Sequence, residues 1–193
     1  MRKVVAAKPR SGNDIDGIAL RIVREFQPDA LENLQNFKIE EFFEFELESL
    51  VGVKSDYRNL QAGILGYIDS DSMMAVIASD LMDDQYAEYY RNSTIAHETG
   101  HAIMHVPEFK RKKAAIRSIT NEDNVKLLLY RESDIPVYRN PEWQAWRFAG
   151  ALLIPEPAIK QALRMKYSVQ KMSDVFRVNP AFVRARMKAL KLI

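Results

Sequence analysis

All three histidines of the chain, His97, His101 and His105, lie within nine residues. Residues 97–101 read His-Glu-Thr-Gly-His, which is an H-E-x-x-H motif. On a helix, residues four apart lie about 40° apart around the axis and ~6 Å apart along it, so both imidazoles can face one metal ion. Glu98 lies on the adjoining flank, where its carboxylate can deprotonate a metal-bound water. The motif predicts His97 and His101 as metal ligands and Glu98 as a general base; the alternative is that three helix histidines merely cap or pack.

The spacing of the third histidine, His105, argues against it as the third metal ligand. His105 lies eight residues from His97, about 12 Å along a continuous helix, which is too far for one tetrahedral centre. His101 and His105 have the same spacing as the first pair, but Ala102 follows His101, so that register lacks a base. We therefore expect His105 to support another ligand or to pack. With no Cys in the chain, a third ligand must be a carboxylate.

Glu142 is our candidate for that ligand. Its downstream competitors are Glu108, Glu122, Asp123, Glu132, Asp134, Glu156 and Asp174. A ligand needs rigid support, which favours a packed helix over a polar loop. Glu142 begins a predicted helix in which Ala145, Phe148, Ala149 and Leu152 recur on the same face, and the two alanines would let another helix approach closely. The alternative is that Glu142 only complements the dipole of the first helical turn.

The surrounding pattern predicts an α+β fold, with a small antiparallel sheet packed on a helical core and a C-terminal helical pair. Apolar spacing and capping residues predict helices over residues 14–26, 83–105, 141–154, 157–166, 168–176 and 180–191, and strands over 51–57, 63–68, 73–78 and 126–131. Residues 39–50 favour a helix, although their alternation of apolar and acidic side chains is also typical of a strand. The basic run at 110–113, which follows Pro107, is interpreted as a solvated loop.

Composition places the chain among globular proteins, with 28 Lys+Arg, 26 Asp+Glu and 47% hydrophobic residues. The absence of Cys excludes disulfides, thiolate metal ligands and a thiol nucleophile. No stretch approaches the roughly 20 apolar residues that cross a bilayer, so we expect a cytoplasmic protein with no membrane partner. Residues 1–96 carry 10 basic and 17 acidic residues, a balance of −7, and residues 97–193 carry 18 and 9, a balance of +9. This asymmetry indicates either that the C-terminal half faces an acidic partner or nucleic acid, or that the two halves attract each other.

Two sequence blocks resemble the ImmA/IrrE family of metallopeptidases. They are Tyr-Arg-Asn-Ser-Thr-Ile-Ala-His-Glu-Thr-Gly-His-Ala-Ile-Met-His at 90–105, and Glu142-x-x-Ala145-x-x-Phe148-Ala149-x-x-Leu152-Leu153-x-Pro155. The resemblance covers most of the chain from about residue 14. It implies a gluzincin-like zinc site with ligands His97, His101 and Glu142 and catalytic Glu98. One position departs from the family, which often has Asn or Asp four residues after the ligand glutamate, where this chain has Trp146.

The resemblance also implies a function and a domain layout. It implies a zinc-dependent endopeptidase that cleaves a regulatory protein, namely a helix-turn-helix transcriptional repressor. The layout is a flexible N-terminus at 1–13, a metallopeptidase domain at 14–166 and a helix-turn-helix-like helical pair at 167–193. Two His and one carboxylate also suit Mn²⁺ or Fe²⁺. A peptide deformylase, which shares the motif, takes a Cys as its remaining ligand, and this chain has none.

The alternative function is a regulatory binding protein with weak or absent turnover that engages a repressor or DNA. Arg184, Lys188 and Lys191 recur along the last predicted helix, as in half of a DNA-binding helix-turn-helix. A helical pair that packs on the core with a solvated basic face explains the same pattern, and we favour it over direct DNA binding. Tyr130, Tyr138 and Arg139 are conceivable oxyanion donors, and the sequence singles out none of them.

Overall fold

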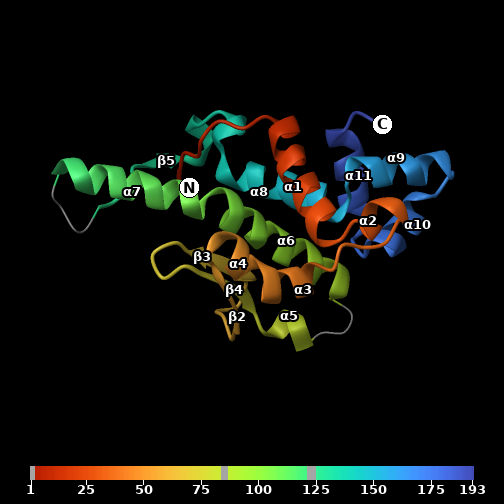
Figure 1. Cartoon of the computed structure of the whole chain (residues 1–193), viewed down its shortest axis with the longest axis horizontal. Coiled ribbons are helices and arrows are strands. Elements are labelled where there is room, and N and C mark those ends of the chain that lie inside the picture. The colour runs from red at the N-terminus through yellow and green to blue at the C-terminus, as the bar shows by residue number, and fades with distance from the viewer. Residues whose placement is uncertain (1–2, 84–86, 121–124) are drawn as a thin grey trace.

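Helices α6 and α8 cross at the centre of the molecule (Figure 1). The computed structural model describes residues 3–83, 87–120 and 125–193. The α-helices of this part are α1 (Gly12–Phe26), α2 (Asp29–Glu32), α3 (Ile39–Glu41), α4 (Leu47–Val51), α5 (Asp80–Asp83), α6 (Glu88–Met104), α7 (Val106–Thr120), α8 (Pro141–Leu153), α9 (Glu156–Arg164), α10 (Val169–Phe176) and α11 (Pro180–Ala189). A π-helical turn η1 (Phe42–Glu46), two short 3₁₀ turns η2 (Glu132–Asp134) and η3 (Val137–Arg139), and strands β1 (Lys3–Val5), β2 (Lys54–Arg58), β3 (Gly66–Asp69), β4 (Met74–Ala78) and β5 (Leu129–Arg131) complete it. The predicted α+β class is confirmed.

Small residues allow α6 and α8 to pack closely. Ala145 and Ala149 of α8 are fully buried. A β-carbon added to Gly100 of α6 would lie 3.2 Å from the Cα of Ala145 and 3.0 Å from the ring of Phe148, which is tighter than ordinary packing allows. The close approach expected from the alanines is therefore present, and it brings the first turn of α8 beside the histidines of α6.

Helix α8 begins where the sequence predicts. The side chain of Asn140 accepts hydrogen bonds from the backbone N–H groups of Glu142, at 2.9 Å, and Trp143, at 3.3 Å. Pro141 occupies the first turn, where its missing N–H is not needed. These caps fix the first turn of α8, from which Glu142 projects.

The three-stranded sheet has the order β2-β4-β3. Strands β3 and β4 are antiparallel, as expected, but β2 runs parallel to β4, with Lys54 opposite Met74 and Arg58 opposite Ala78. The prediction of a wholly antiparallel sheet is wrong for this pair. Burial accounts for the strand order that makes this pair possible: β4 reads Met-Ala-Val-Ile-Ala and is largely buried, so it takes the central position beside both β2 and β3, which are more polar and take the edges. Strand β3 therefore has one edge that no strand of the described chain covers.

Two further segments are helical. Residues 39–51 form helical turns and not a strand, because Ile39, Phe42, Phe43 and Leu47 share the buried face while Phe45 is exposed. The basic run at 110–113 lies within α7, so its interpretation as a loop is wrong. Pro107 does not end structure there because it falls in the first turn of a new helix, where proline is tolerated.

The N-terminal segment is also ordered against the core. Within residues 1–13, for which flexibility remains a prediction, residues 3–5 form β1, which pairs antiparallel with β5, and Ala6 and Ala7 are buried; residues 1–2 lie outside the described part. The backbone N–H of Ala7 donates to the carbonyl of Arg139 at 2.9 Å.

Of the strand expected over 126–131, only residues 129–131 form a strand, β5. Of the long helix expected over 83–105, α5 ends at Asp83 and α6 begins at Glu88, and residues 84–86 lie outside the described part.

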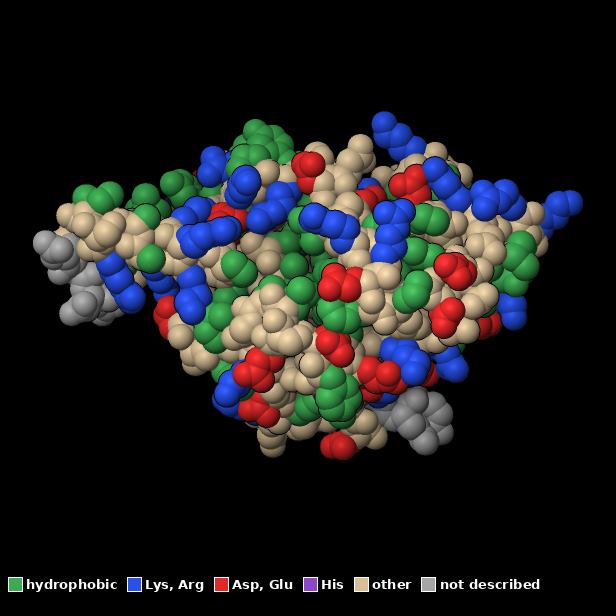
Figure 2. All heavy atoms as spheres, in the orientation of Figure 1, with side chains coloured by type: hydrophobic (Ala, Val, Ile, Leu, Met, Phe, Trp, Pro, Cys, Tyr) green, Lys and Arg blue, Asp and Glu red, His purple; other side chains and the backbone are tan. Residues whose placement is uncertain are grey.

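Ion pairs join the acidic N-terminal half to the basic C-terminal half. Asp16 of α1 accepts hydrogen bonds from Arg147 of α8, at 2.8 and 2.5 Å, and from Arg186 of α11, at 3.0 and 3.2 Å. Asp71 pairs with Lys113 at 2.6 Å. These contacts support mutual attraction as one cause of the charge asymmetry. On the face in Figure 2, basic side chains also follow α7 and the C-terminal helices, where they remain in solvent.

The C-terminal helices dock on the core. Arg186 is buried, and its Nε donates to the carbonyl of Ile154 at 3.0 Å. The basic residues Arg184, Lys188 and Lys191 are exposed on the same segment. No helix in the described residues is both long and apolar enough to span a bilayer.

Candidate metal centre

Two helices bring three potential ligands together. His97 and His101 project from α6, and Glu142 projects from the first turn of α8. The two Nε2 atoms are 3.1 Å apart, and each lies 3.5 Å from an oxygen of Glu142, Oε2 for His97 and Oε1 for His101. Ligands about 2.0–2.1 Å from a tetrahedral zinc ion are separated by ~3.3 Å. The group therefore has the donor types and spacing that could hold a metal ion.

The group lies in a cleft of about 340 Å³. Residues Gly66, Tyr67 and Ile68 of β3 line one side, and residues of β1 and β5 are also part of the lining. The side chains of His97, His101 and Glu142 keep 9%, 15% and 16% exposure. The site is thus held rigidly but open to solvent, as a catalytic metal site must be to admit a substrate.

Glu98 shares this cleft and is 8% exposed. Its position depends on Gly66, because a β-carbon at residue 66 would lie 2.9 Å from Glu98 Cγ and 3.0 Å from the carbonyl oxygen of Val76. Gly66 was not among the site residues predicted from the sequence. Its signal was a glycine at the beginning of a strand, which often marks a close approach of another group to the backbone.

His105 contacts His101. The Nδ1 atoms of the two rings are 2.9 Å apart, and His105 Nε2 is 3.1 Å from Oε1 of Gln144. His105 is 2% exposed, and burial, followed by the neighbouring imidazole of His101, lowers its pKa well below the ordinary value. Gln144 is fully buried and was not among the predicted site residues; its signal was a lone amide within an otherwise apolar helix face.

Trp146 occupies the position where the resemblance suggests a polar residue. Its ring lies against the imidazole of His97, with centroids 4.2 Å apart and planes tilted by 36°, and it contacts Phe182 of α11 edge-on at 6.4 Å. Aromatic packing thus holds the His97 ring on this side. The same contact links the candidate site to the C-terminal helical pair.

The competing carboxylates have other partners. Glu108 accepts from the backbone N–H of Lys8 at 2.7 Å and pairs with Arg10 at 3.2 Å and Lys112 at 2.7 Å. The others are Glu132, bonded to Asn140, Asp134, bonded to Ser133, Glu156, paired with Lys160, and Asp174, bonded to Gln170. Glu122 and Asp123 lie outside the described residues.

Among the oxyanion candidates, Tyr130 and Tyr138 are about half exposed and Arg139 Nε donates to the carbonyl of Ala7.

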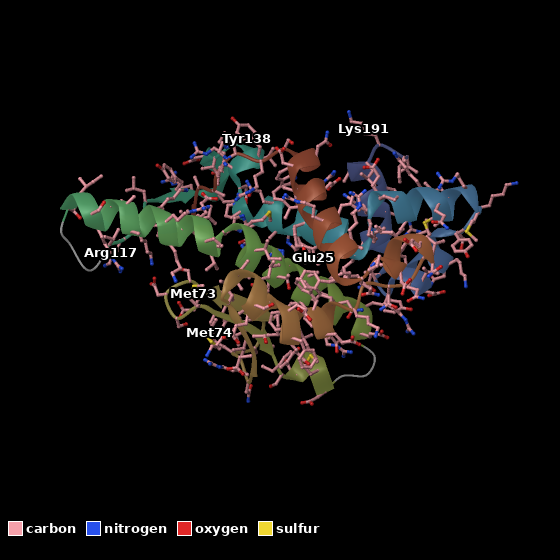
Figure 3. All side chains as sticks on the ribbon, in the orientation of Figure 1. Glu25, Met73, Met74, Arg117, Tyr138 and Lys191 are labelled. Atoms are coloured by element: carbon pink, nitrogen blue, oxygen red, sulfur yellow. The ribbon has the colours of Figure 1, made fainter. Side chains whose placement is uncertain are left out.

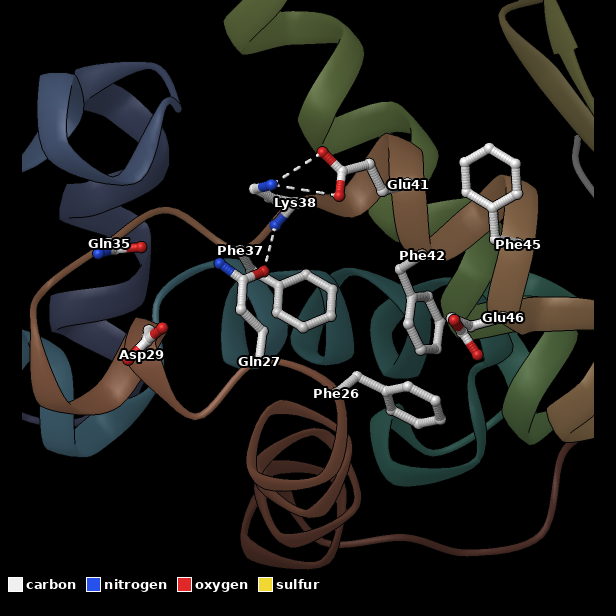
Figure 4. Close-up of a pocket in the computed structure, with 10 residues that line it drawn as sticks. All are labelled: Phe26, Gln27, Asp29, Gln35, Phe37, Lys38, Glu41, Phe42, Phe45 and Glu46. Carbon is white, nitrogen blue, oxygen red and sulfur yellow. Dashed lines mark hydrogen bonds and ion pairs between the residues drawn. The ribbon is translucent and has the colours of Figure 1, made fainter.

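A second hollow, of about 380 Å³, lies between α1, α2 and the α3–η1 segment (Figure 4). Phe26, Phe37 and Phe42 line it, and its polar groups bind one another: Lys38 Nζ is 3.0 Å from Glu41 Oε1, and the backbone N–H of Lys38 donates to Gln27 at 2.8 Å. No histidine is among its lining residues, whereas the three potential metal ligands lie in the cleft beside β3.

Two histidines and a glutamate thus converge from crossing helices as a group that could hold a metal ion, the donor set found in many metallopeptidases. Residues 81–188, more than half of the chain, match the family model described as IrrE N-terminal-like domain, Peptidase_M78, and the chain belongs to this family. A comparison with curated proteins finds no match.

A solved structure described as a Mycobacterium tuberculosis transcriptional regulator is similar in fold. Its TM-score is 0.60 and its sequence identity 15%, over 91% of this chain and 46% of that one. The chain therefore spans less than half the length of that protein, and at this identity the likeness concerns the fold alone.

Proposed function

We propose that the protein is a zinc-dependent endopeptidase. The observation that carries the proposal is the convergence of three ligand side chains in a cleft that also contains the Glu98 side chain: the two histidine Nε2 atoms are 3.1 Å apart, and each lies 3.5 Å from one oxygen of Glu142. His97, His101 and Glu142 would hold the ion, and Mn²⁺ or Fe²⁺ would suit the same donors. When bound, such an ion supplies Lewis-acid polarisation of a carbonyl and acidifies water.

The protein's own groups supply the remaining steps. The open edge of β3 offers backbone N–H and C=O groups to an extended peptide, which would then lie along the cleft lined by Gly66, Tyr67 and Ile68. Glu98 would accept a proton from the attacking water and return it to the leaving amine nitrogen. Burial of Glu98 on one side against β3 keeps its carboxylate in a fixed position for both transfers.

The proposed substrate is a regulatory protein, specifically a helix-turn-helix repressor. Family membership and a neighbour of similar fold named as a transcriptional regulator support this choice. We assign residues 14–166 to the metallopeptidase domain and 167–193 to a docked helical pair, because Arg186 and Trp146 tie that pair to α1 and α8. We also place the protein in the cytoplasm, where such a repressor would be found.

The test compares the wild type with Glu98→Gln, which keeps the ligands and removes the base. Both proteins are loaded with zinc, analysed for metal content and incubated with a candidate helix-turn-helix repressor, chosen from the genes next to this one where they encode such a protein. We expect one zinc per chain in both, and cleavage only by the wild type. Binding of the repressor without cleavage by either protein would favour the alternative, a regulatory binding protein. A His97→Ala, His101→Ala double variant should lose the metal itself.

A further inference from the structure

We propose that His105 and Gln144 form a hydrogen-bond relay that fixes the tautomer of His101, so that the lone pair of its Nε2 atom faces the metal site. The inference rests on the proposed metal site, and it assigns a positioning role to two residues that are not themselves ligands. It follows from the donor and acceptor character of each group along the relay.

The amide of Gln144 has only one orientation. Its Nε2 lies 2.9 Å from the carbonyl oxygen of Lys8 and 2.7 Å from that of Tyr138. Tyr138 lies on η3, at the upper edge of the molecule in Figure 3. Carbonyl oxygens only accept, so the NH₂ group must face them. The Oε1 atom consequently faces His105 Nε2, at 3.1 Å, and the guanidinium of Arg10, at 2.9 Å.

This orientation sets the tautomer of His105. Because an amide oxygen only accepts, the hydrogen on the neutral ring of His105 must be on Nε2, which leaves Nδ1 as an acceptor. Nδ1 of His105 is 2.9 Å from Nδ1 of His101. His101 must then carry its hydrogen on Nδ1 and donate it to His105.

The last step concerns the opposite nitrogen of His101. With the hydrogen on Nδ1, its Nε2 is unprotonated, and this atom lies 3.5 Å from Glu142 and 3.1 Å from His97 Nε2. A neutral imidazole binds a metal only through its unprotonated nitrogen. The relay thus prepares the ligand before an ion arrives, and it also prevents rotation of the His101 ring.

The N-terminal segment locks the far end of the relay. Arg10 donates to the carbonyl of Met104 at 3.0 Å and to Glu108 at 3.2 Å, which holds its guanidinium on Gln144. Gln144 is fully buried and His105 is 2% exposed, so bulk water has little access to replace either hydrogen bond. Partners of this kind behind a histidine ligand typically change metal affinity by about 10–100-fold when they are removed.

The primary experiment reads the tautomers directly in the metal-free, full-length protein. With three histidines in the chain, a long-range ¹H–¹⁵N correlation spectrum of histidine-labelled protein at pH 8 resolves six ring nitrogens. We expect His101 protonated at Nδ1 and His105 protonated at Nε2. A wild-type spectrum with His101 protonated at Nε2 would overturn the proposal without any variant.

Two variants of His105 distinguish a role in the hydrogen-bond relay from a role in packing alone. His105→Leu fills the space but offers no acceptor, whereas His105→Asn keeps an acceptor near the position of Nδ1. Zinc affinity, measured by competition with a chromophoric chelator, should fall about 10–100-fold in His105→Leu and by less in His105→Asn, with the Nδ1–H form of His101 retained only in the latter. Equal affinities in two folded variants would contradict the relay. If the wild type binds no zinc although its tautomers are as expected, the proposed metal site fails and the hydrogen-bond assignment stands.

Discussion

Gly100 of α6 faces Ala145 of α8 so closely that a β-carbon on the glycine would lie 3.2 Å from the alanine Cα. Glu142 precedes Ala145 by three residues, within the same helix. The separation of the two helices at this contact therefore determines whether the carboxylate reaches the histidines. The geometry of the candidate metal centre depends on a residue that contributes no ligand.

Replacement of Gly100 by Leu should push the helices apart. We expect a stability loss of about 1–3 kcal/mol from overpacking and a zinc affinity at least tenfold lower, measured by urea unfolding and chelator competition. Gly17→Leu is the matched control, because Gly17 lies on α1 and a β-carbon added there would meet no atom within 4 Å. That control should gain up to about 1 kcal/mol of helix propensity and keep its zinc affinity. Equal affinities in the two variants would refute the role given to the contact.

Replacement of Gly66 by Ala should displace the carboxylate of Glu98, the proposed base, without disturbing the proposed ligands. The new β-carbon would lie 2.9 Å from Glu98 Cγ, so either Glu98 or β3 must shift. We expect the zinc content to stay at one per chain and kcat against the repressor to fall at least tenfold, which corresponds to about 1.4 kcal/mol of transition-state stabilisation. An unchanged kcat would show that Glu98 tolerates the displacement.

Trp146 should report metal binding. Its ring lies 4.2 Å from that of His97, so coordination of that imidazole changes the electrostatic environment of the indole. We expect zinc to change the tryptophan fluorescence of the wild type and of Trp143→Phe, and to have little effect on Trp146→Phe. The comparison is matched because these are the two tryptophans of the chain. A response that follows Trp143 instead would place the ion elsewhere.

Asp16 should be important for the docking of the C-terminal helices. Its carboxylate neutralises Arg186, whose side chain is 2% exposed, and also binds Arg147. Asp16→Asn removes the carboxylate that pairs directly with a buried guanidinium, which should lower the free energy of unfolding by about 3 kcal/mol. Glu48→Gln is the control, because its pair with Lys54 is exposed, at 60% and 64%, and should cost less than about 1 kcal/mol. Urea denaturation measures the stability loss of each variant. A clearly larger loss in Asp16→Asn would show that its ion pairs stabilise the fold, and similar losses would show that they are dispensable.

Local patterns were sufficient for the parts of the site that lie within one helix. The i,i+4 spacing of His97 and His101 depends only on helix geometry, and the face shared by Glu142 and Ala145 could be seen in the same way. The long-range partners could not be predicted. Gln144 meets the carbonyl of Lys8, 136 residues earlier in the chain, and no periodicity encodes that contact. The parallel pairing of β2 with β4 depended on competition among strands for the buried position, which no single segment reveals.

The basic run at 110–113 was predicted as a loop because Pro107, which precedes it, can be interpreted in two ways. Pro107 ends a helix that precedes it and equally begins one that follows it. The structure realises the second case, with α6 ending at Met104 and α7 starting at Val106. The resulting α7 carries Glu108, which binds Lys8 and Arg10, so a wrong prediction for this segment also concealed the attachment of the N-terminal residues.

That attachment makes residues 7–10 part of the support of the candidate metal centre. Ala7, Lys8 and Arg10 bind Arg139, Gln144 and Glu108 through backbone or side-chain hydrogen bonds. A protein shortened to begin at Ser11 would retain the proposed ligands and Glu98, yet would lose the hydrogen bonds that join Gln144 to Lys8 and Arg10. Cleavage of the chain before residue 11, or binding of a partner that displaces residues 7–10, would remove hydrogen bonds that hold Gln144 and would thereby weaken the support of the proposed ligand His101.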